Sequence, residues 1–139
     1  MTIKETQEEI IEEFALFDEW MDKYEHIIEL GKDLPLIDEQ YKTEDNLIKG
    51  CQSRVWLHAE LIDGKIIFTA DSDAIITKGI IALMIRVFSH HSPKEIADAE
   101  LFFIDQIGLK EHLSPTRSNG LVAMVKQIKV YSIAFQAKA

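Results

Sequence analysis

The sole cysteine of this 139-residue chain, Cys51, is the side chain best suited to nucleophilic chemistry. A thiolate is the most nucleophilic group available near neutral pH, and the glycine, glutamine and serine around it at positions 50–53 are typical of an accessible loop. Lys49 and Arg54 lie close by in sequence and would favour the charged form of the thiol. The alternative is a buried free cysteine that acts as a small apolar residue.

No second group in the sequence completes a recognised site around Cys51. A histidine acting as a base would form a Cys–His dyad with Cys51. The sequence neither supports nor rules out this role for His58, His90, His91 or His112. Zinc and iron–sulfur sites need several cysteine or histidine ligands at set spacings, so we expect no bound metal and no cofactor. Walker, dinucleotide-binding and serine-elbow motifs are also absent from the sequence.

Charge and composition limit the classes of partner. The formal net charge is -9, whereas nucleic acids and anionic membrane surfaces attract clusters of lysine and arginine, so neither is expected as the main partner. Acidic residues far outnumber basic ones in residues 1–50, and basic residues prevail in residues 101–139. With 47% hydrophobic residues and this length, we expect one domain over residues 1–139.

Three features predict a cytoplasmic protein. A single cysteine cannot form an internal disulfide. The N-terminus is acidic and helical in pattern, unlike a signal peptide. The most apolar run, residues 79–88, is interrupted by Arg86 and is shorter than the roughly 20 residues that a membrane span needs.

The elements that would position Cys51 are predicted from periodicity and turn residues. Apolar residues recur at helical spacing up to Gly31, with a capping box at Thr2 and a break near Asp18 as an alternative to one long helix. Alternation then predicts strands on both sides of a tight Asp63–Gly64 turn, and residues 47–49 are expected to form a short third strand.

Helices are predicted for most of the chain after the strands. Residues 71–73 offer three candidate caps for a helix from Ala74 to about Phe88, which is apolar on nearly all sides and must therefore be central. Gly79 within it predicts a close neighbour. Ser92–Pro93 and Ser114–Pro115 indicate two later helix starts. The order of elements predicts an α+β fold with two or three antiparallel strands.

Three blocks of the sequence resemble the signature blocks of the SufE family of sulfur acceptors. They are Lys49–Leu57, Ala70–Ala74 leading into Lys78–Gly79, and Leu113–Leu121. The order and separation of the blocks also match, and with the helical N-terminus the resemblance covers nearly the whole chain. Three blocks that agree in order form a far more specific signal than any one block.

The resemblance implies a fold of the SufE and IscU type, with a small antiparallel sheet of about three strands packed against helices. It also implies that Cys51 takes sulfur from a persulfide on a pyridoxal-phosphate cysteine desulfurase and thereby activates that enzyme. The sulfur would then pass to an iron–sulfur scaffold complex. The family pattern further implies partner contact or loop positioning for Gln52, Asp73 and Arg117. A helix cap and a surface arginine are the simpler interpretations of Asp73 and Arg117.

Other classes compete with sulfur acceptance. A cluster scaffold would need several cysteines, and a thiol peroxidase or redox sensor often has a resolving cysteine or a positive pocket. The chain has one cysteine. A regulatory interaction domain of a desulfurase or scaffold, with an incidental cysteine and no sulfur relay, is the main alternative.

Overall fold

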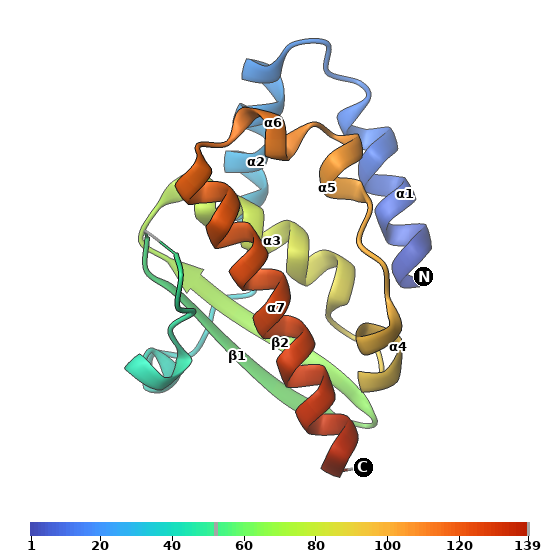
Figure 1. Cartoon of the computed structure of the whole chain (residues 1–139), viewed down its shortest axis with the longest axis vertical. Coiled ribbons are helices and arrows are strands. Elements are labelled where there is room, and N and C mark those ends of the chain that lie inside the picture. The colour runs from blue at the N-terminus through green and yellow to red at the C-terminus, as the bar shows by residue number, and fades with distance from the viewer. Residues whose placement is uncertain (52, 139) are drawn as a thin grey trace.

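The computed structural model of the chain describes residues 1–51 and 53–138. Along the chain, two helices are followed by a β-hairpin and then by further helices (Figure 1). The α-helices are α1 (Ile3–Phe14), α2 (Trp20–Gly31), α3 (Ile75–Phe88), α4 (Pro93–Asp98), α5 (Phe103–Gln106), α6 (Leu109–His112) and α7 (Pro115–Lys138). The strands are β1 (Val55–Ile62) and β2 (Lys65–Ser72), preceded by two 3-10 turns at Glu39–Tyr41 and Glu44–Asn46. The predicted α+β class is confirmed.

The sheet formed by the described residues is a two-stranded antiparallel hairpin, so the predicted count of about three strands is wrong by one. Asp63 and Gly64 take the positive φ values of 51° and 78° that the tight turn requires. The expected third strand is reduced to an isolated bridge between Leu47 and Trp56. The ladder ends there because the chain turns away at Gly50, whose φ is 94°.

Helices α3 and α7 both pack against the face of the hairpin that carries Leu57 and Phe68 (Figure 1). The Tyr131 hydroxyl on α7 donates a hydrogen bond to the Leu57 carbonyl at 3.3 Å, and the Tyr131 ring meets Phe68 edge to face. Because α3 is also covered by α2, most of its side chains are buried, as its apolar sequence predicts.

The crossing of α2 and α3 depends on two glycines that face each other. A Cβ atom on Gly79 would overlap the backbone carbonyl of Ile27 and lie 2.6 Å from its Cγ2 atom. A Cβ atom on Gly31 would lie 2.9 Å from the backbone nitrogen of Gly79. The close neighbour predicted from Gly79 is therefore the backbone of α2, which approaches too closely for any side chain.

The starts of α1, α4 and α7 follow their predicted capping signals, whereas those of α2 and α3 do not. The capping boxes at Thr2 and Ser92 are present, and the Ser114 hydroxyl accepts from the backbone N–H of Arg117 in the first turn of α7. The N-terminal segment breaks into α1 and α2, with Glu19 rather than Asp18 at the second N-cap position. Helix α3 begins after Ala74 with no side-chain cap, because the Asp73 carboxylate accepts from the Arg54 N–H instead.

No helix among the described residues is both long enough and apolar enough to cross a bilayer.

Candidate functional site

Cys51 lies where the loop before β1 meets α3 and α7. Its side chain is half-buried, and its sulfur is 3.6 Å from the carbonyl oxygen of Gly120, which accepts a weak hydrogen bond from the thiol. Beside the sulfur is a cavity of about 20 Å³, enough for about one water-sized group. The other residues that line this cavity are Ser53, Thr77, Ile80, Arg117, Gly120 and Met124.

Glycines at two positions allow the loop to approach α7 this closely. A Cβ atom on Gly120 would lie 3.4 Å from the sulfur of Cys51 and 3.7 Å from its Cα atom. Gly50 has φ 94°, a conformation that other residues rarely adopt, and a Cβ atom there would lie 3.4 Å from Cβ of Ala123. The position of the thiol therefore depends on small residues both in the loop and in the helix.

Burial controls the protonation of the thiol in this arrangement. Loss of solvent around the Cys51 thiol raises its pKa, because the charged thiolate is disfavoured away from water. The prediction that Lys49 and Arg54 favour the thiolate is wrong for this conformation, since burial alone accounts for the shift and the Arg54 side chain is exposed. The sheltered thiol is therefore neutral near neutral pH.

Asp73 is linked to Cys51 through the backbone of Arg54. Its Oδ1 atom accepts a hydrogen bond from the Arg54 backbone N–H at 3.0 Å, and the Ser72 hydroxyl donates to the Arg54 carbonyl at 2.8 Å. These bonds fasten the end of the Cys51 loop to the junction between β2 and α3. The helix-cap interpretation of Asp73 is wrong, because α3 has no side-chain cap.

Arg117 lies at the cavity itself, with an exposed side chain in the first turn of α7. The structure thus brings Arg117 to the cavity beside Cys51. Asp73 does not line the cavity and is connected to the Cys51 loop through its hydrogen bond to the Arg54 backbone. The prediction for Gln52 falls outside the described residues.

The candidate histidine bases lie in other surroundings. His58 stacks on Tyr41, with ring centroids 3.8 Å apart, and His112 stacks on Trp20 at 4.2 Å. The backbones of residues 90–91 pair with the edge of β2. None of the described residues that line the Cys51 cavity is a histidine. The structure therefore gives no support to a Cys–His dyad.

Thr77 and Gly120 are parts of the site that sequence reasoning missed. The Thr77 hydroxyl lies 3.5 Å from the Ser53 hydroxyl, which connects α3 to the loop two residues after Cys51. The sequence could have indicated the role of Gly120, because a glycine within a long predicted helix is unfavourable unless another segment packs closely against it. In residues 1–51 and 53–138, no group of three or more histidine, cysteine, aspartate or glutamate side chains is placed to hold a metal ion.

Comparison with known proteins identifies the family. A family model described as "SufE: Fe-S metabolism associated domain" matches residues 8–132, which include the whole Cys51 site. The chain belongs to the SufE family. Its role therefore lies in iron–sulfur metabolism, as the three sequence blocks predicted.

Curated relatives agree with this assignment, and a solved structure shares the fold. The SufE-family chain is 42% identical over 127 residues to an uncharacterised SufE-like protein of Rhizobium meliloti, covering 88% of this chain and 91% of the relative. A SufE-like protein of Rhizobium etli, also uncharacterised, is 41% identical over 127 residues, covering 88% and 86%. The solution structure of a hypothetical protein from Thermus thermophilus has the same fold, with a TM-score of 0.76 at 19% identity and coverage of 93% and 94%.

Proposed function

We propose that Cys51 accepts the outer sulfur of a persulfide carried by a pyridoxal-phosphate cysteine desulfurase. The observation that carries this proposal is the sole cysteine beside a cavity of about 20 Å³, inside the segment that matches the SufE family model. Residues 1–139 act as one domain that delivers this thiol to its partners. The accepted sulfur then passes to an iron–sulfur scaffold complex.

The transfer needs one thiol and no bound cofactor. The Cys51 thiolate attacks the outer sulfur of the partner's persulfide, and a new S–S bond forms to Cys51. The S–S bond within the partner's persulfide breaks, and its electron pair leaves on the partner's cysteine as a thiolate. The proton lost from Cys51 goes to solvent or to that leaving thiolate. No external oxidant or reductant is consumed, because the outer sulfur moves from one thiolate to another. Removal of the sulfur frees the desulfurase for another turnover, which accounts for activation.

The surroundings of Cys51 suit a thiol that reacts only when docked. In the sheltered position burial raises its pKa, so the thiol is mostly neutral and weakly nucleophilic. Docking on the desulfurase draws the loop outward about Gly50, and contact with solvent and partner charges brings the pKa back down. Arg117, exposed at the cavity, contacts the partner, while Asp73 holds the Arg54 end of the loop in place. Gln52, next to Cys51 in sequence, is the third residue assigned to partner contact or loop positioning.

The test uses the full chain, a pyridoxal-phosphate cysteine desulfurase and free cysteine. We expect mass spectrometry of the alkylated, unreduced protein to find the mass of one added sulfur atom on the peptide that contains Cys51. The addition disappears after treatment with a reducing agent and is absent from Cys51→Ser. A Cys51 peptide that gains no sulfur, although the desulfurase turns over, would contradict the proposal.

A regulatory interaction domain without sulfur relay is the second candidate, and the burial of the thiol favours it, because buried free cysteines are common fillers. Two measurements on Cys51→Ala and on the Cys51 peptide distinguish these functions: the stimulation of desulfurase turnover and the added sulfur. Under sulfur acceptance, Cys51→Ala loses the stimulation of desulfurase turnover. Under regulation, Cys51→Ala stimulates as well as the parent chain, and the peptide carries no sulfur.

A further inference from the structure

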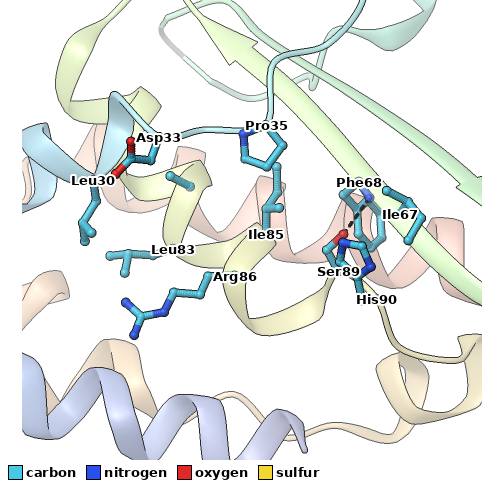
Figure 2. A pocket seen from close by; sticks show the side chains of 11 residues that line it. Leu30, Asp33, Pro35, Ile67, Phe68, Leu83, Ile85, Arg86, Ser89 and His90 are labelled. Atoms are coloured by element: carbon cyan, nitrogen blue, oxygen red, sulfur yellow. Dashed lines mark hydrogen bonds between the residues drawn. The ribbon is translucent and has the colours of Figure 1, made fainter. Parts of the chain in front are cut away.

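Four hydroxyl side chains are buried among the described residues, and one of them lacks a close partner. They belong to Thr6, Thr77, Ser89 and Ser132. Thr6 and Ser132 donate to backbone carbonyls at 3.1 and 2.6 Å. Ser89, which lines a larger pocket beside β2, accepts from the Phe68 N–H at 2.9 Å, shown by the dashed line in Figure 2. Within the described chain, only Thr77 has no partner at such a distance.

The one contact of the Thr77 hydroxyl is with Ser53, across the boundary between α3 and the Cys51 loop. The two oxygens are 3.5 Å apart. Hydrogen bonds between hydroxyl groups are usually about 2.5–3.0 Å long, so this contact is too long to be a strong one. Thr77 is 6% exposed, and a buried hydroxyl without a good hydrogen bond costs free energy. A third group between the two hydroxyls would satisfy both.

The space for such a group is the cavity beside the Cys51 sulfur, because Ser53 and Thr77 both line it. Its volume of about 20 Å³ leaves room for about one added atom, so an atom that enters touches the walls. The S–S bond of a persulfide is about 2.05 Å long, which places the outer sulfur next to the wall that Cys51 itself forms.

The charge of a persulfide matches the donors around this cavity. Persulfides are more acidic than thiols, so the outer sulfur is anionic near neutral pH. A buried anion needs hydrogen-bond donors or a positive charge nearby. Ser53 and Thr77 supply two hydroxyl protons, and Arg117 is the one charged residue among the described residues of the lining. The resting thiol uses none of these groups, since it donates to the Gly120 carbonyl.

We propose that Thr77 and Ser53 bind the outer sulfur of the Cys51 persulfide by donating hydrogen bonds to it. This inference rests on the proposed function, because it concerns the state that follows sulfur acceptance. The free thiol does not fill the cavity, so the two donors stabilise the sheltered position of the loaded loop more than that of the unloaded loop. The accepted sulfur is thereby kept from solvent until a recipient draws the loop outward.

The test loads the sulfur chemically, without a desulfurase. The Cys51 thiolate of the full chain attacks sodium tetrasulfide, one sulfur atom becomes bonded to Cys51, and a trisulfide dianion leaves. After gel filtration, mass spectrometry measures the added sulfur. Dithiothreitol then reduces the persulfide to thiol and sulfide and is itself oxidised to a cyclic disulfide. The rate of sulfide release therefore measures access to the outer sulfur.

Thr77→Val keeps the shape of the side chain and removes the hydroxyl. We expect sulfide release about tenfold faster than in the parent chain, because one hydrogen bond to a charged group is lost. Ser53→Ala should accelerate release similarly, whereas Thr77→Ser keeps the hydroxyl and should stay within about twofold of the parent rate. Thr69→Val, the same change on β2 outside the cavity, is the matched control and should leave the rate unchanged.

Alkylation of the unloaded thiol distinguishes sulfur binding from a structural role of Thr77. Iodoacetamide should modify Cys51 at the same rate in the parent chain, Thr77→Val and Thr77→Ser, because the free thiol does not use these donors. Equal acceleration of alkylation and of sulfide release in Thr77→Val would mean that Thr77 only holds the loop, and would overturn the proposal. Sulfide release at the parent rate in Thr77→Val would also overturn it. So would a parent chain that gains no sulfur from tetrasulfide although iodoacetamide modifies its Cys51.

This test and the desulfurase assay can fail separately. Sulfide release that is slowed by the Thr77 hydroxyl, in a chain that takes no sulfur from a desulfurase, would support the outer-sulfur site and contradict the proposed function. Normal transfer from the desulfurase, together with sulfide release that does not depend on Thr77, would overturn this inference alone.

Discussion

The carbonyl oxygen of Gly120 lies 3.6 Å from the sulfur of Cys51, although the two residues are 69 positions apart in the chain. The backbone of α7 therefore covers one side of the thiol. It can come this close because Gly120 has no side chain. The space left beside the sulfur, about 20 Å³, holds little more than one additional atom of water size. Small changes at Gly120 should thus alter the exposure of the thiol.

Gly120→Val should push Cys51 out of its shelter. Overpacking of a filled site costs about 1–3 kcal/mol, so the equilibrium between sheltered and exposed thiol should shift by about tenfold. We expect alkylation of Cys51 by iodoacetamide at pH 7 to become correspondingly faster. Ala134→Val, the same side chain introduced at an exposed position of α7, is the control and should not change the rate. An unchanged or slower rate in Gly120→Val would show that the helix does not restrain the thiol.

The pH dependence of stability should carry a contribution from Cys51. Burial raises its pKa in the folded protein above the unfolded value, so folding favours the protonated thiol. This contribution is fully present below the unfolded pKa and is lost as pH rises through the folded pKa. Urea unfolding measured from pH 7 to pH 10 should show a decrease in the free energy of unfolding of the parent chain. Cys51→Ser should not show this decrease. Parallel stability curves for the two proteins would argue against a buried, neutral thiol.

Gly79→Ala should destabilise the protein strongly. The added methyl would overlap the Ile27 carbonyl of α2, so the two helices would have to separate. We expect a loss of about 3 kcal/mol or more in the free energy of unfolding, at the upper end of overpacking costs. Gly64→Ala meets no atom within 4 Å and suffers only from its positive φ, so its loss should be about 1 kcal/mol. Thermal or urea unfolding distinguishes the two, and equal losses would contradict the helix-contact explanation.

Asp73→Ala should loosen the end of the Cys51 loop. Without the carboxylate, the Arg54 N–H loses its acceptor at 3.0 Å. A hydrogen bond to a charged group contributes about 1.5 kcal/mol, so amide hydrogen exchange at Arg54 should accelerate by about tenfold. Asp73→Asn keeps an acceptor oxygen and should show a smaller change. If exchange at Arg54 is the same in all three proteins, Asp73 does not position the loop.

Features of the fold that depend on neighbouring residues were predictable from the sequence. Alternation on both sides of Asp63–Gly64 predicted the hairpin, and the capping box at Thr2 and the Ser92–Pro93 start signal predicted helix starts, because each signal involves hydrogen bonds between residues a few positions apart. The errors fall where tertiary contacts compete with local preference. Asp73 has the chemistry of a helix cap, yet its carboxylate bonds to Arg54, 19 positions earlier in the chain.

The sequence by itself determined which residue is able to carry the chemistry, because Cys51 is the only thiol in the chain. It also determined the family, through three blocks in the order typical of that family. Only the tertiary structure decided that the thiol is sheltered and neutral, since its burial depends on Gly120 and Met124 of α7 and on Thr77 and Ile80 of α3. This shelter arises from packing between distant segments, which local sequence patterns do not encode.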